Sequence, residues 1–142
     1  MNILIAPNAF KNSLAADKVA EAIGIGLQQS KLQCNIQCFP IGDGGDGTAH
    51  LLIQHLHGSI VNTIVYDPLH RKINSSFGFV INDRTAIIEL ADASGLRLLH
   101  KDEYDPLHAT TYGTGELIKA VLDIEAKKII LCIGGSATVD GG

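Results

Sequence analysis

Short apolar runs alternate with a segment of helical periodicity in the first part of the chain. Residues 2–6 are almost entirely apolar and end at Pro7, which is typical of a buried parallel strand. Residues 14–29 repeat apolar side chains at helical spacing after Ser13, a residue type that commonly caps helices, and residues 34–40 predict a second strand. The order strand, loop, helix and strand predicts a right-handed βαβ unit with parallel strands. Its helix is expected to bury Ala16, Val19, Ala20, Ile23 and Leu27.

After residue 58 the pattern changes to strands that follow one another directly. A helix over residues 49–57 is expected to end at Gly58, the predicted C-terminal cap. Strand-like runs then cover residues 59–67, 72–81 and 84–90, with turns between them. Consecutive strands without helices are typical of an antiparallel meander, so we predict that a second domain begins within residues 59–68.

The last part of the chain again joins a helix to a strand. Residues 91–95 and 101–107 are expected to be irregular. The helix that starts after residues 110–116 is expected to bury Leu117, Ile118, Val121 and Leu122. Residues 127–133 predict a strand that leads directly into a glycine-rich run over residues 134–142.

Composition and charge exclude several classes of protein. Hydrophobic residues make up 46% of the 142 residues and charged residues 18%, which is typical of a globular chain. The net charge is −4 and there is no basic cluster, so nucleic acid is not an expected partner. Without a signal peptide or a stretch of transmembrane length, we expect a cytoplasmic protein with no membrane contact. The cysteines all lie on predicted strands and are expected to be buried and unbridged: Cys34, Cys38 and Cys132.

Four loops rich in small residues carry the candidate chemistry. They cover residues 7–13, 41–48, 110–116 and 134–142. Each lies after a strand or before a helix, and the N–H groups at a helix N-terminus favour bound anions. None has the Walker A pattern or the G-x-G-x-x-G pattern, so the sequence gives little support to a dinucleotide site.

The loop over residues 41–48 holds four glycines and two aspartates. Asp43 and Asp46 suit a hydrated Mg²⁺, which prefers one or two carboxylates together with substrate phosphates. Lys11, in the first loop, offers a mobile cation to a phosphate. The alternative is that the two aspartates only cap the next helix and that Lys11 is a solvated surface residue. Three polar residues after a strand are either substrate groups or part of a plain turn: Glu89, Asp92 and Ser94.

Together these loops resemble those of the bacterial type I glycerate kinases. The matching segments are IAPNAFKNSL (residues 5–14), GDGGDGT (residues 42–48), TTYGTGELI (residues 110–118) and GGSATVDGG (residues 134–142), in the same order. The resemblance implies ATP- and Mg²⁺-dependent phosphorylation of D-glycerate to 2-phosphoglycerate. It also implies an α/β protein with two domains. Residues 1–62 would belong to a flavodoxin-like or Rossmann-like domain with a parallel sheet, and residues 63–142 to a second, inserted α/β domain with antiparallel strands.

The resemblance, read with the residue chemistry, assigns roles to the loop residues. Lys11, Asp43 and Asp46 are the expected catalytic residues, and the two aspartates are the expected metal ligands. The residues expected to bind phosphate or substrate are Asn8, Ser13, Gly44, Gly45, Thr48, Thr111, Gly113, Thr114, Gly115, Ser136, Thr138 and Asp140. Asn8 stands where the family commonly has aspartate, and Asp46 stands where many members have glutamate.

Other functions remain compatible with the same loops. One is a non-catalytic protein that binds a nucleotide or a small anion, and another is a related sugar-acid kinase. Members of the family are much longer than this chain, and the chain stops inside a glycine-rich run. We therefore expect an N-terminal portion that is a poor kinase alone, and that forms a homodimer or needs a C-terminal segment.

Overall fold

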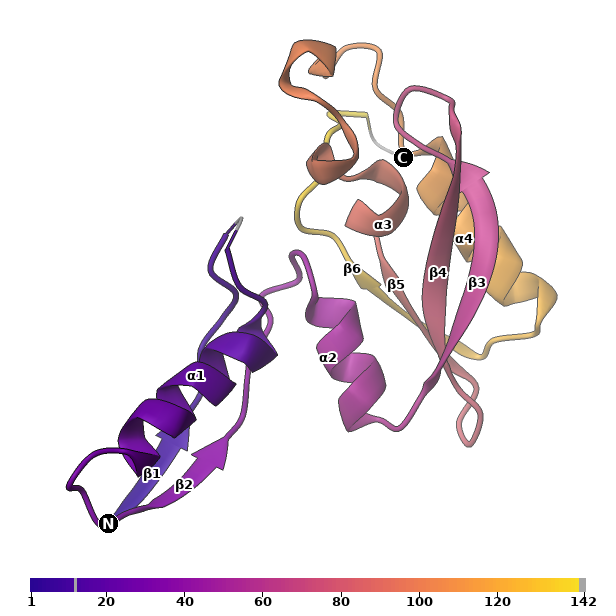
Figure 1. The fold of residues 1–142 in the computed structure, drawn as a ribbon. Coiled ribbons are helices and arrows are strands. Elements are labelled where there is room, and N and C mark those ends of the chain that lie inside the picture. The colour runs from indigo at the N-terminus through magenta and orange to yellow at the C-terminus, as the bar shows by residue number, and fades with distance from the viewer. Residues whose placement is uncertain (12, 141–142) are drawn as a thin grey trace. The chain divides into compact units, whose positions relative to one another are not determined.

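The computed structural model describes residues 1–11 and 13–140 and divides into two compact units, Met1–Asp43 and Gly44–Gly142 (Figure 1). The fold is mixed α/β, with a parallel pair of strands in the first unit and antiparallel strands in the second, which confirms the predicted fold class. The predicted domain ranges refer to a longer protein, whereas the two compact units are those formed within residues 1–142. The predicted ranges 1–62 and 63–142 therefore stay a prediction.

The first unit is a βαβ element made of β1 (Asn2–Ile5), α1 (Ala16–Gln28) and β2 (Asn35–Cys38). The strands pair in parallel, from Asn2 opposite Asn35 to Ile5 opposite Cys38. The parallel pairing expected from the sequence is thus confirmed. Beyond the strands, the Ile41 N–H donates to the Pro7 carbonyl at 2.9 Å, so the loops that follow β1 and β2 begin next to each other.

Three expectations for this unit are wrong. Ser13 does not cap α1: the cap position is Ala15, and the Ser13 N–H donates to the Phe10 carbonyl in the preceding turn. Of the strand β1, only Ile5 is buried. The physical reason is that the sheet has two strands and α1 is the element packed against it in this unit. The same narrow contact leaves Ile23 exposed in α1, where the buried residues are Ala16, Val19, Ala20 and Gly24.

The second unit contains a four-stranded mixed sheet in the order β3-β4-β5-β6 (Figure 1). Its strands are β3 (Ser59–Tyr66), β4 (Lys72–Val80), β5 (Thr85–Glu89) and β6 (Lys128–Cys132). The first three pair antiparallel, which confirms the predicted meander, and β6 pairs in parallel with β5. The remaining elements are α2 (Thr48–His55), α3 (Ala91–Ser94), α4 (Tyr112–Asp123) and two short 3-10 helices, η1 (Leu96–Leu98) and η2 (Lys101–Glu103). Parts of the segments expected to be irregular are therefore helical.

Alternate residues of β5 face two separate hydrophobic clusters. Ile88 packs in a cluster with Leu117 and Val121 of α4, whereas Ile87 packs in a cluster with Ile53 of α2. Because successive side chains of a strand point to opposite faces, α2 and α4 cover opposite faces of the sheet. β5 is consequently an inner strand that is buried on both faces, and its C-terminal end leads into the candidate site.

The end of α2 differs from the prediction. His57, with φ of 53°, is the left-handed residue after the helix, and not Gly58. The Gly58 N–H donates to the Ile53 carbonyl at 2.8 Å and the His57 N–H to the Gln54 carbonyl at 3.3 Å, which is a Schellman motif. Gly58 instead allows close packing, because a Cβ there would lie 3.2 Å from Val80 Cγ2.

We predict that Leu117→Ala lowers the free energy of unfolding by about 2–5 kcal/mol, because it opens a cavity in the α4 cluster. Leu117 is fully buried, whereas Leu122, which the sequence pattern also placed in the buried stripe, is 55% exposed. Leu122→Ala is therefore the matched control and should change the free energy of unfolding by less than about 0.5 kcal/mol. Urea unfolding of the two variants checks this, and equal losses would contradict the packing described for α4.

The cysteine predictions are confirmed in part. All three cysteines are free in the structure. Only Cys132 is buried; Cys34 is half-buried and Cys38 is exposed, because the two-stranded sheet of the first unit has little cover.

Candidate functional site

Parts of two predicted loops, residues 44–48 and 134–138, lie against each other in the second unit. Gly44 and Gly47 have φ of 90° and 86°, a region that favours glycine. The Gly134 N–H donates to the Gly44 carbonyl at 2.7 Å, and a Cβ on Gly134 would lie 2.5 Å from the Gly45 Cα. The glycines therefore serve two purposes: a tight turn in the first loop and the close approach of the second.

The first loop is also held by side chains. The Thr48 hydroxyl accepts the Gly44 N–H at 3.1 Å. Glu89, at the end of β5, accepts the Gly47 N–H at 2.8 Å with Oε1 and the Ala49 N–H at 2.9 Å with Oε2. A buried carboxylate thus occupies the N-terminus of α2.

Three carboxylates surround one guanidinium beside this loop, and we call Asp46, Glu89, Asp92 and Arg97 the acidic–arginine cluster. Arg97 Nε lies 3.2 Å from Asp46 Oδ1, and Nη2 lies 3.9 Å from Glu89 Oε1 and also contacts Asp92. Burial raises the pKa of Glu89, and the hydrogen bonds from Gly47 and Ala49 oppose that rise. Burial likewise raises the pKa of Asp92, where Arg97 opposes it.

The N-terminus of α4 is arranged in a similar way. Asp140 Oδ2 accepts both the Thr111 N–H at 2.8 Å and the Thr111 hydroxyl at 2.9 Å. The hydrogen bond from the Thr111 backbone is the main reason that the pKa of Asp140 is lowered. The Thr114 hydroxyl lies 2.8 Å from that of buried Ser94, which ties α4 to α3.

Gly113 and Gly115 have different surroundings although they are two residues apart in α4. A Cβ on Gly113 would lie 1.8 Å from the Tyr66 carbonyl oxygen, so this glycine allows α4 to pack against the end of β3. Glu116 strengthens the same contact by accepting the Tyr66 N–H at 2.8 Å. A Cβ on Gly115 would have no atom within 4 Å.

A groove of about 830 Å³ lies within the second unit beside α4 and β6. Apolar side chains of Ile118, Leu131 and Ile133 form part of its wall. Six predicted site residues line it: Thr111, Thr114, Gly115, Ser136, Thr138 and Asp140. The fold therefore brings together residues from two loops that lie far apart in the sequence.

The remaining predicted residues belong to the first unit or to the loop itself. Asn8 makes a local contact, in which its Oδ1 accepts the Ala9 N–H at 2.7 Å. Ser13 lies in the turn before α1, and Lys11 and Asp43 also belong to this unit. The roles of these residues in binding or catalysis stay predictions.

Arg97 is the residue that sequence reasoning missed entirely. It lies between the two segments expected to be irregular, residues 91–95 and 101–107, and no motif or periodicity marks it. Glu89 and Asp92 were candidates because a charge ends an apolar run, but the loop that Glu89 contacts lies about 40 residues earlier in the sequence. Only the tertiary structure shows that pairing.

Across residues 1–11 and 13–140, no group of three or more His, Cys, Asp or Glu side chains is arranged to hold a metal ion. Nor does any helix within those residues have both the length and the apolar character needed to cross a membrane.

Comparison with known proteins gives one consistent family. The family model described as "Glycerate kinase family" matches residues 3–142. Curated relatives include a glycerate kinase of Bacillus subtilis, 46% identical, and a glycerate 2-kinase of Escherichia coli, 44% identical; each match covers all of this chain and 37% of the relative. A crystal structure from Salmonella typhimurium LT2, described as glycerate kinase 2, superposes with a TM-score of 0.77 at 42% identity. It covers all of this chain and 38% of that one.

Proposed function

Since the chain belongs to the glycerate kinase family, we propose that it serves the ATP- and Mg²⁺-dependent phosphorylation of D-glycerate to 2-phosphoglycerate. The chain spans a little over a third of the length of the curated relatives it matches, so the activity is proposed for the protein that carries this sequence. The observation that supports it best is the meeting of two glycine-rich loops beside the acidic–arginine cluster. Phosphoryl transfer depends chiefly on positioning and charge stabilisation, which such loops provide.

Asp43 and Asp46 are the proposed ligands of Mg²⁺, and one of them is the proposed acceptor of the glycerate hydroxyl proton. Asp46 suits this role because its side chain is 58% exposed and its loop is held by the hydrogen bonds from Gly44 to Thr48 and from Gly47 to Glu89. Mg²⁺ typically uses one or two protein carboxylates and takes its other ligands from water and phosphate. The lack of a larger ligand cluster among the described residues is therefore compatible with it. The ion, when bound, would offset charge on the phosphates.

The other loop residues are assigned to binding. Lys11 would offset the charge of a phosphate or of the glycerate carboxylate. The proposed phosphate- and substrate-binding residues are Asn8, Ser13, Gly44, Gly45, Thr48, Thr111, Gly113, Thr114, Gly115, Ser136, Thr138 and Asp140. The N–H of Thr111 already has Asp140 as its acceptor, so a phosphate at the start of α4 would need to displace that carboxylate or bind beside it.

An assay with two proteins tests the proposal. We would express this chain alone and the complete reading frame that encodes it, and measure ATP-dependent product formation from D-glycerate by ³¹P NMR. We expect turnover from the complete reading frame and little from the chain alone, because Ile133 and Val139 are exposed apolar residues at the end of β6 and in the loop that follows. Cytoplasmic location and a homodimer are further expectations, which fractionation and light scattering would check.

The outcomes separate the alternatives. Turnover with other hydroxy acids but not with D-glycerate would indicate a related sugar-acid kinase. Nucleotide binding without turnover in both proteins would indicate a non-catalytic binding protein. Comparable turnover from both proteins would place the whole active site within residues 1–142.

A further inference from the structure

We propose that Glu89 is the positioning residue of the proposed catalytic loop: it fills the anion site at the start of α2 and thereby fixes Asp46. The structural part of this proposal, that Glu89 holds the loop, rests on geometry alone. The catalytic part, that this hold is needed for turnover, rests on the proposed function. Nothing in the sequence pattern joins Glu89 to this loop, because about 40 residues separate them.

The start of α2 has no local side-chain cap. Its cap residue is Gly47, which has φ of 86° and no side chain to accept an N–H group. Ser, Thr and Asp, the usual capping residues, are disfavoured at that backbone angle. Glu89 replaces the local cap from β5, since its two carboxylate oxygens each accept one N–H group of the first turn.

Glu89 is suited to hold this position rigidly. The residue is only 3% exposed, and it is the last residue of β5, a strand in which every residue is buried. A buried carboxylate needs hydrogen-bond donors, and a helix N-terminus supplies donors with a favourable dipole. Each group therefore satisfies the other, and moving either one leaves a buried polar group without its partner.

Two separate routes connect Glu89 to Asp46. The first runs through the backbone: the Gly47 N–H donates to Glu89, and Asp46 is joined to Gly47 by a peptide bond. The second passes through Arg97, which lies 3.9 Å from Glu89 and 3.2 Å from Asp46. The buried carboxylate of Glu89 therefore positions both the backbone and the side chain of Asp46.

This arrangement also decides what the loop can bind. The N–H groups of Gly47 and Ala49, which a bound phosphate would use at an open helix N-terminus, already have an acceptor. The loop instead presents the Asp46 carboxylate. We therefore assign this loop to the metal ion and the reacting hydroxyl, and we expect the phosphates of ATP to bind N–H groups other than those of Gly47 and Ala49.

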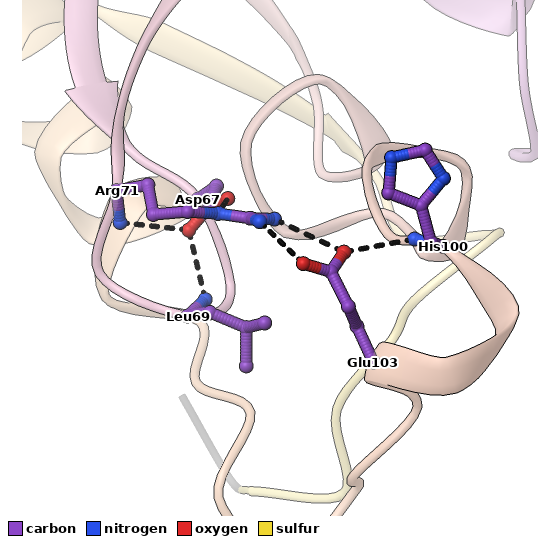
Figure 2. A network of polar contacts seen from close by, with 5 residues as sticks. All are labelled: Asp67, Leu69, Arg71, His100 and Glu103. Carbon is purple, nitrogen blue, oxygen red and sulfur yellow. Dashed lines mark hydrogen bonds and ion pairs between the residues drawn. The ribbon is translucent and has the colours of Figure 1, made fainter.

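Asp67 provides a closely matched comparison within the same chain (Figure 2). Its buried carboxylate also accepts two backbone N–H groups, from Leu69 at 2.9 Å and Arg71 at 2.8 Å, and pairs with one arginine side chain. Arg71 then reaches Glu103, whose Oε2 accepts the His100 N–H at 2.9 Å. This network holds the turn between β3 and β4 to η2 and includes none of the proposed catalytic residues.

The test compares Glu89→Gln with Asp67→Asn in this chain and in the complete reading frame. Glutamine keeps the size of Glu89 but has one acceptor oxygen for two N–H groups. We expect amide hydrogen exchange at Gly47 and Ala49 to become about tenfold faster or more in Glu89→Gln. We expect kcat to fall about tenfold or more, with a higher Mg²⁺ concentration at half-maximal rate. Asp67→Asn should leave the exchange rates, kcat and the Mg²⁺ dependence within about twofold of those of the unmodified protein. Its loss of thermal stability should be similar to that of Glu89→Gln.

Each outcome supports or overturns the proposal. Slow exchange at Gly47 and Ala49 in the unmodified chain supports the structural part even if Glu89→Gln fails to fold, and fast exchange there overturns it. Faster exchange in Glu89→Gln with unchanged kcat and Mg²⁺ dependence overturns the catalytic part. If the unmodified complete protein phosphorylates no hydroxy acid, the proposed function fails, while the exchange data still decide whether Glu89 holds the loop.

Discussion

Asp46→Asn is expected to lower the turnover of D-glycerate phosphorylation by about 100-fold or more in the complete protein, with the fold retained. Asparagine has nearly the shape of aspartate but no negative charge, so it is a weak ligand for Mg²⁺ and cannot accept the substrate proton. Asp43→Asn should act in the same direction. Steady-state assays across a Mg²⁺ titration measure the effect.

The fold should tolerate Asp46→Asn because Asp46 forms an ion pair with Arg97 in which both side chains are partly exposed. Such pairs contribute at most about 1 kcal/mol to stability. Asp123→Asn is the control: its side chain is 62% exposed, pairs with Lys119 at 2.6 Å and lies at the C-terminal end of α4. Near-normal turnover in both Asp43→Asn and Asp46→Asn would refute the metal assignment.

Gly113→Ala is expected to destabilise the chain by about 2–4 kcal/mol, although alanine is normally the better helix former. The added Cβ would lie 1.8 Å from the Tyr66 carbonyl oxygen and 2.9 Å from its carbon, so the backbone of α4 or β3 must move. Movement would also stretch the bond from the Tyr66 N–H to Glu116. Urea unfolding measures the loss.

Gly115→Ala makes the same change two residues later in the same helix, where a Cβ would have no atom within 4 Å. It should stabilise the chain by about 0.5–1 kcal/mol, as expected for alanine in a helix interior. Opposite signs for the two substitutions would show that Gly113 is required for packing. Equal effects would mean that α4 does not lie against β3 as described.

Local patterns were sufficient for much of the fold. The run over residues 2–6, the helical periodicity before residue 29 and the turns between residues 59 and 90 predicted a parallel βαβ unit followed by a meander, and the structure has both. These features depend on residues close together in the sequence, because hydrophobic periodicity and turn-forming residues determine structure over only a few positions. Burial was predicted less well, since it depends on what covers each face. Residues such as Ile23 and Leu122 fit an apolar stripe, yet they lie beyond the packed contact and are exposed.

The sequence by itself determined which loops carry glycines, hydroxyl groups and carboxylates, and through them the family to which this chain belongs. The tertiary structure alone decided how those groups are used. It placed Glu89 on the amides of Gly47 and Ala49, and it brought Arg97 to Asp46. The physical reason is distance along the chain: a carboxylate and the N–H groups that it satisfies leave no joint signature in sequence when about 40 residues lie between them, and only the packing of β5 beneath α2 brings them together.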